Sequence, residues 1–260
     1  MSIVREEIGV DTPSGSMGVR ISRPDLESRH PLLVFFHRGP GFDEGSWWAM
    51  DQFAAAGFFV VAPDRYHRID TWPWIDTVAL RAAGAGSSLQ QRFHRMLGET
   101  TEDVVAEDVD ALLSVFRGDA RIAPGAYVSV GYCIGARSVI RMMRDRPRCV
   151  AGAALQPSQC VTDAEDSPHR QVPQIAGELY VAIGAADRHA GPEVSAPLIE
   201  AVQTLGPRGR VQIYEGAEHG FTLPGAGFLP ETAARVNAAV REMFAAALSV
   251  AHDDVRGGAR

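Results

Sequence analysis

Short apolar runs alternate with longer segments of helical periodicity along most of the chain. Continuous apolar runs such as 31–36 (PLLVFF) are typical of strands buried on both faces of a sheet. Apolar residues over 101–116 recur three and four positions apart, which predicts an amphipathic helix. Strands are predicted over 3–9, 17–23, 31–36, 58–63, 126–130, 150–155, 178–184 and 211–215. Helices are predicted over 46–56, 101–116, 134–145, 193–205 and 231–248.

Strands that alternate with helices over this length predict an α/β protein, with a mostly parallel central sheet and helices on both faces. Segments 64–99 and 156–176 have no clear period and are expected to be irregular. No internal repeat or long linker divides the chain. We therefore expect a single α/β domain over 1–250, followed by a flexible tail over 251–260.

The stretch 128–140 (VSVGYCIGARSVI) has an apolar run, two glycines around a cysteine, and then a helical pattern. Its spacing is that of the nucleophile elbow G-x-S-x-G, with Cys133 in place of serine. Such a turn lifts its central side chain above the sheet, and it aims the backbone N–H of Ile134 at an oxyanion. Cysteine is also a common buried packing residue. Because Gly131 and Gly135 flank it at the elbow spacing, we interpret Cys133 as catalytic.

An acid and a histidine follow in the order that the α/β-hydrolase fold requires. Asp187 comes directly after the predicted strand 178–184, and His219 lies in the loop after the last predicted strand. Because carboxyl ends of parallel strands meet at one edge of a sheet, both side chains are expected near Cys133. Cys149 and Cys160 lack such a context, and we interpret them as packing residues.

Composition excludes several other functions. All 25 basic residues are arginine, which rules out a lysine Schiff base and a lysine-containing phosphate loop, so GAGSS at 84–88 is interpreted as a flexible turn. The net charge of −7 argues against nucleic acid or an anionic membrane as partner.

Three cysteines are too few for a disulfide framework. The histidines lack metal-ligand spacing, so no metal is expected. No secretory signal or long apolar span is visible, and the cytoplasm is the expected location.

Four stretches carry a resemblance to a known family: APDRYHR (62–68), GYCIGAR (131–137), GAADRHAGPE (184–193) and YEGAEHGFTLP (214–224). Together they resemble the dienelactone hydrolase family of α/β-hydrolases over roughly residues 30–248. The resemblance implies that Cys133 is the nucleophile, His219 the base and Asp187 its orienting acid. It also implies a small cyclic enol-lactone or similar ester as substrate, with no cofactor.

The loop after the third predicted strand departs from the best-known family members. They carry a glutamate there that helps to deprotonate the thiol, whereas here 37–41 read HRGPG. We expect the second oxyanion donor at the backbone of Gly39. Arg38 could favour the thiolate, bind an anionic substrate, or be an ordinary solvated residue. Arg92 and Phe221 are further candidates for substrate binding.

Three functions therefore remain open. The first is hydrolysis of a small activated ester or lactone through a Cys-His-Asp triad and a thioester intermediate. The second is non-catalytic ligand binding on the hydrolase scaffold. The third is redox sensing by the thiol, although no C-x-x-C pair is present. The sequence gives no indication of the oligomeric state.

Overall fold

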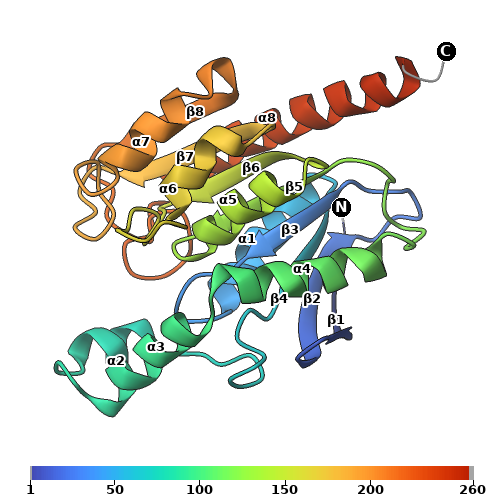
Figure 1. Ribbon diagram of the computed structural model, residues 1–260. Helices are drawn as coiled ribbons and strands as arrows, with labels where there is room; N and C mark the ends of the chain where they lie inside the picture. Colours follow the sequence, from blue (N-terminus) through green and yellow to red (C-terminus); the bar gives the residue numbers. More distant parts are fainter. Residues whose placement is uncertain (1, 258–260) are drawn as a thin grey trace.

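A single eight-stranded sheet forms the centre of the computed structural model, which describes residues 2–257 (Figure 1). The strand order is β1-β2-β4-β3-β5-β6-β7-β8. Strands β3 to β8 pair in parallel, whereas β1 and β2 form an antiparallel hairpin that continues antiparallel onto β4. The mostly parallel sheet is thus confirmed. The strands are β1 (Ile3–Thr12), β2 (Gly15–Pro24), β3 (Leu32–Phe36), β4 (Phe59–Pro63), β5 (Tyr127–Tyr132), β6 (Cys149–Leu155), β7 (Glu178–Gly184) and β8 (Gly209–Tyr214).

Helices cover both faces of this sheet, as predicted. Successive residues of β3 alternate between two apolar clusters: Val34 joins the cluster that holds α4, α5 and α7, and Leu33 joins the one that holds α1 and α8. Burial on both faces explains why such strands read as unbroken apolar runs. The helices are α1 (Glu44–Ala55), α2 (Thr77–Ala82), α3 (Ser88–Glu99), α4 (Glu102–Phe116), α5 (Gly135–Asp145), α6 (Pro168–Gln171), α7 (Ala196–Gln203) and α8 (Pro230–Gly257). Within residues 2–257, no helix combines the length and apolar character needed to cross a membrane.

Segment 64–99 is more regular than expected, because it contains α2 and α3. Both helices lie beyond the edge of the sheet, at the lower left of Figure 1. Apolar side chains of α3, such as Phe93 and Met96, pack in a small cluster of their own with Tyr66 and Ile75. The Ser87 hydroxyl caps the start of α3 by accepting from the backbone N–H of Gln90, so 84–87 is the turn between the two helices.

The chain end and the segment after β6 also differ from prediction. Helix α8 continues to Gly257 instead of ending at 248, so the part of the expected tail over 251–257 is helical, and 258–260 lie outside the described residues. The expected loop 156–176 contains the short helix α6, followed by a 3-10 turn over Val172–Gln174.

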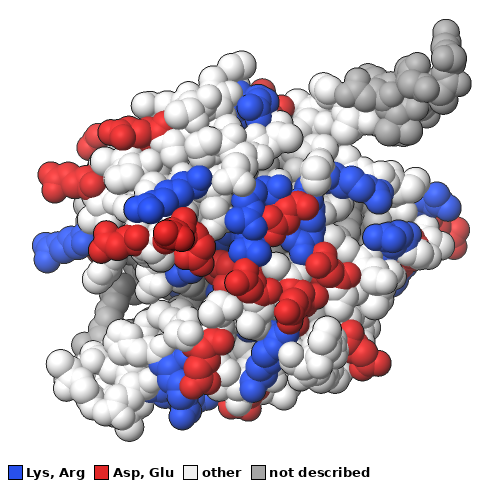
Figure 2. Space-filling view, viewed as in Figure 1, with Lys and Arg blue, Asp and Glu red and all other residues white. Residues whose placement is uncertain are grey.

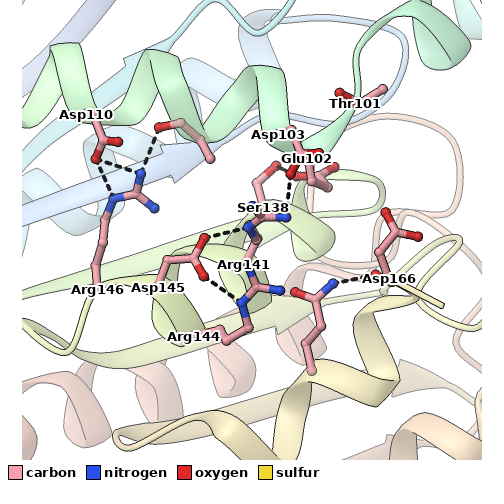
Figure 3. A network of polar contacts seen from close by, with 12 residues as sticks. Thr101, Glu102, Asp103, Asp110, Ser138, Arg141, Arg144, Asp145, Arg146 and Asp166 are labelled. Atoms are coloured by element: carbon pink, nitrogen blue, oxygen red, sulfur yellow. Dashed lines mark hydrogen bonds and ion pairs between the residues drawn. The ribbon is translucent and has the colours of Figure 1, made fainter.

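A network of ion pairs fixes α5, the helix that follows the cysteine turn, to α4 (Figure 3). The buried carboxylate of Glu102 accepts a 2.7 Å hydrogen bond from the Ser138 hydroxyl and pairs with Arg65 at 3.3 Å. Nearby, Arg141 pairs with Asp103 at 2.7 Å. Figure 2 shows the same face, on which arginine and acidic side chains lie next to one another. Most of these arginines are therefore partnered, and α5 is held firmly behind the turn.

Candidate active site

The turn between β5 and α5 presents Cys133 above the carboxyl end of the sheet. Cys133 has a φ of +56°, a left-handed backbone that is strained for a residue with a side chain. A Cβ atom at Gly131 would overlap the carbonyl oxygen of Gly135, and one at Gly135 would overlap that of Phe36. Both glycines are therefore required for the turn to close against β3. This geometry is that of a nucleophile elbow.

His219 and Asp187 meet at the carboxyl ends of β7 and β8. The imidazole Nδ1 of His219 donates to Oδ2 of Asp187 at 2.6 Å. The other carboxylate oxygen accepts the backbone N–H groups of His189 and Ala190, at 2.8 and 3.0 Å. Burial raises the pKa of the Asp187 carboxyl, but His219 and the two N–H groups outweigh it, and the pKa lies below its ordinary value. The carboxylate stays charged and holds the imidazole with its other nitrogen free.

The side of the His219 imidazole that does not contact Asp187 faces the Cys133 thiol. Burial raises the thiol pKa, yet the hydrogen bond and charge of His219, with the backbone N–H groups of Gly39 and Ile134, bring it below its ordinary value. Burial lowers the pKa of His219, but the hydrogen bonds and charges of Asp187 and Cys133 outweigh burial and raise the pKa to about 10. His219 therefore favours the charged form of the Cys133 thiol, and the thiolate in turn favours the imidazolium. The cation that most lowers the thiol pKa is His219.

The other two cysteines lie in the core, as expected. Cys149 is buried at the start of β6, where burial raises its thiol pKa to about 12. Cys160 is also buried, and its thiol pKa is raised for the same reason. Of the three thiols, only Cys133 is partly accessible and has a lowered pKa.

Loop 37–41 carries one of the two N–H groups at the sulfur, and two side chains hold its peptide planes. The imidazole Nδ1 of His37 donates to the carbonyl of Arg38 at 2.9 Å, in the same peptide unit as the Gly39 N–H. The Tyr66 hydroxyl donates to the Gly39 carbonyl at 2.8 Å. Gly39 and Ile134, the two predicted N–H donors, line the same cavity as Cys133, and their backbone N–H groups help to lower its thiol pKa. The supporting roles of His37 and Tyr66 were not predicted, because the sequence does not reveal which backbone carbonyl a side chain meets.

A cavity of about 340 Å³ opens over Cys133. Helices α2 and α3 form one wall, and loop 37–41 and the segments after β6, β7 and β8 form the rest. Two larger hollows, of about 500 and 910 Å³, lie at the amino ends of the strands, away from Cys133. The lining of the smaller cavity is Arg38, Gly39, Pro40, Thr77, Leu80, Phe93, Leu97, Cys133, Ile134, Gln156, Ser158, Gln159, His189, His219, Gly220 and Ala226.

The three residues predicted to bind substrate differ in position. Arg38 lines the cavity, but its guanidinium forms an ion pair with Asp43. Arg92 is absent from the lining and pairs with Asp70 at 3.4 Å, with 41% of its side chain exposed. Phe221 is fully buried in the core and packs on another aromatic ring. The predictions for Arg92 and Phe221 are thus corrected: one faces solvent and the other the core.

Comparison with known proteins identifies the family of this chain. Residues 17–248 match the dienelactone hydrolase family. The protein Dienlactone hydrolase 1 of Gibberella moniliformis is 25% identical over 221 residues, which are 85% of this chain and 76% of that protein.

Solved structures show the same fold. A protein from Klebsiella pneumoniae, described as a candidate dienelactone hydrolase, superposes with a TM-score of 0.81 at 17% identity, covering 94% of this chain and 99% of that one. The dienelactone hydrolase of Anabaena variabilis has a TM-score of 0.68 at 13% identity, covering 95% and 99%. Because the family match spans nearly all of the sheet and the site, this chain belongs to the dienelactone hydrolase family and is an ester or lactone hydrolase.

Proposed function

We propose that this hydrolase cleaves a small activated ester or lactone through Cys133, His219 and Asp187, with a thioester intermediate. The observation that carries the proposal is the arrangement at the sulfur. A thiol of lowered pKa meets an imidazole whose far nitrogen is held by a buried carboxylate, and two backbone N–H groups point at the same place. Each feature matches one requirement of nucleophilic acyl transfer.

In the first half-reaction, the Cys133 thiolate attacks the acyl carbon and forms a C–S bond. The carbonyl oxygen becomes an oxyanion, which the N–H groups of Gly39 and Ile134 stabilise. The C–O bond to the leaving group breaks, and the imidazolium of His219 gives its proton to the departing alkoxide or enolate. Asp187 keeps the imidazole oriented and stabilises its charged form.

In the second half-reaction, neutral His219 removes a proton from water, and the resulting hydroxide attacks the thioester. Collapse of the second oxyanion breaks the C–S bond, releases the carboxylic acid and restores the thiolate. No loop glutamate is needed in this scheme, because the imidazole supplies both the thiolate-stabilising charge and the proton transfers.

Two alternatives fit the structure less well. A non-catalytic binding protein would not need a thiol of lowered pKa next to an oriented imidazole. A redox-sensing thiol is often placed next to a resolving cysteine, whereas Cys149 and Cys160 are buried and have raised pKa values.

The test is hydrolysis of p-nitrophenyl acetate and of a dienelactone by wild type and by Cys133→Ala, with Cys149→Ala as the matched control. We expect Cys133→Ala to lose on the order of 10⁴-fold or more in kcat, by analogy with removal of other triad nucleophiles, and Cys149→Ala to retain turnover. Mass spectrometry of the quenched reaction should find the acyl group on Cys133. Turnover by Cys133→Ala, or an acyl group on another residue, would refute the mechanism.

A further inference from the structure

The cavity over Cys133 has an apolar side next to loop 37–41, which carries the Gly39 N–H. Its residues are Pro40, Leu80, Phe93, Leu97, Ile134 and Ala226. Two side chains of α3 lie directly against this loop: a Cβ atom at Gly39 would be 3.3 Å from the Phe93 ring and 3.5 Å from Leu97 Cδ2. Phe93 and Leu97 therefore offer hydrocarbon beside the loop residue whose N–H is the proposed oxyanion donor.

The arginine that lines the cavity is already paired. Arg38 is the only arginine in the described lining, and only 12% of its side chain is exposed. Its guanidinium pairs with Asp43 and lies 5.5 Å from the centre of the Trp74 ring. Asp43 is in turn held at the start of α1, where it caps the helix. A substrate carboxylate would have to compete with Asp43, which is partly buried, for Arg38.

Gln156 supplies a donor suited to a neutral oxygen. It follows β6, is 1% exposed, and has a left-handed φ of +44°, so its position is tightly constrained. Its side-chain oxygen accepts the backbone N–H of Thr222 at 3.3 Å and the Thr222 hydroxyl at 2.8 Å. Because the backbone N–H can only donate, the amide oxygen faces Thr222, and the NH₂ group is the part of the amide not used in these bonds. Gln156 lines the cavity, where that group can bind an ester oxygen.

We propose that this site selects esters with an uncharged, apolar acyl group, which packs on Phe93 and Leu97 while the Gln156 NH₂ donates to a neutral oxygen of the substrate. This inference rests on the proposed function and names its substrate class. A carboxylate on the acyl chain would lose its hydration against Phe93 and Leu97 without gaining a free cation. Burial of an unpaired carboxylate costs enough to separate the two substrate classes by about 100-fold or more.

The test uses two esters that differ by one group. 4-Nitrophenyl hexanoate and mono-4-nitrophenyl adipate share the leaving group and chain length, but the terminal methyl of one is a carboxylate in the other. We expect kcat/KM for the hexanoate to exceed that for the adipate by about 100-fold or more, after subtraction of the rate of Cys133→Ala.

A charge placed in the cavity should reverse part of this preference. Leu97→Arg should lower the hexanoate-to-adipate ratio about tenfold or more, since a hydrogen bond to a charged group is worth that factor. His94→Arg, on the exposed side of the same helix, is the matched control and should leave the ratio unchanged. The ratio is read within each variant, so a loss of folded protein cancels.

The outcomes separate this inference from the proposed function. If both esters are cleaved through Cys133 with similar kcat/KM, or the adipate is preferred, the substrate class is wrong and the mechanism stands. If neither ester acylates Cys133, both proposals fail. Equal shifts in Leu97→Arg and His94→Arg would assign the effect to long-range charge and overturn the role of the apolar wall.

Discussion

Substitution of His37 tests how loop 37–41, which carries the Gly39 N–H, is held in place. Its ring is fully buried behind loop 37–41, where burial and neighbouring arginines lower its pKa to about 3, so it is neutral at pH 7. Since a carbonyl can only accept, the Nδ1 atom that lies 2.9 Å from the Arg38 carbonyl must carry the proton. This hydrogen bond fixes the peptide unit that presents the Gly39 N–H to the sulfur. His37 is thus a positioning residue.

His37→Leu removes that donor while keeping a side chain of similar bulk. The Gly39 N–H remains but loses its fixed orientation, so the cost is that of one hydrogen bond, about 1–2 kcal/mol. At 1.4 kcal/mol per factor of ten, we expect kcat for p-nitrophenyl acetate to fall about tenfold, well short of the 10²–10³ lost when an oxyanion donor is removed outright. KM should change little. The thiol pKa of Cys133 should rise, because the Gly39 N–H lowers it.

His37→Asn is the matched variant, because the asparagine side-chain N–H₂ can occupy the place of Nδ1. It should recover kcat to within about threefold of wild type, and the thiol pKa, read from the pH dependence of iodoacetamide alkylation, should return with it. Thermal unfolding monitors stability in parallel. If His37→Leu keeps full kcat, or the Asn and Leu variants lose equally, the hydrogen bond is not what holds the Gly39 peptide unit.

Three further substitutions test the rest of the site. Asp187→Asn should lower kcat by about 10⁴-fold with KM nearly constant, because it favours the wrong tautomer of the imidazole; steady-state kinetics that show less than a tenfold loss would contradict this. Gly131→Ala should lower the melting temperature and abolish turnover, since its Cβ overlaps the Gly135 carbonyl; a stable, active variant would disprove the close approach. The transition in the pH dependence of Cys133 alkylation should lie below the ordinary thiol pKa, because His219 favours the thiolate, and His219→Ala should move this transition to higher pH. An unmoved transition would mean that another group lowers the thiol pKa.

Sequence patterns predict the central sheet well, because strands buried on both faces must be continuously apolar. They fail over 64–99 for a physical reason. Helix α3 buries one narrow apolar stripe against a small cluster, and most of its other positions are polar, so its apolar pattern is sparse. The signal that could have identified this helix was the serine at its N-cap, Ser87, with apolar residues at helical spacing after it.

The placement of the candidate residues can be predicted where it depends on the order of the strands. Cys133, Asp187 and His219 each follow a strand, and the carboxyl ends of parallel strands must meet. Phe221 was misassigned because closeness to His219 in sequence does not set direction. Gly220 between them has a φ of +92°, and the chain then turns Phe221 into the core.

The α2–α3 segment has a consequence for how the specificity of this enzyme can change. Its apolar contacts form a cluster separate from the two that stabilise the sheet, and it lies between β4 and α4 as an excursion from the main body. The proposed catalytic residues Cys133, Asp187 and His219 lie outside it, in turns and loops that follow strands of the sheet. Substitutions in α2 and α3 can therefore change the cavity wall proposed to contact the acyl group, while the proposed catalytic residues keep their positions. Substrate selectivity can thus change separately from the catalytic mechanism.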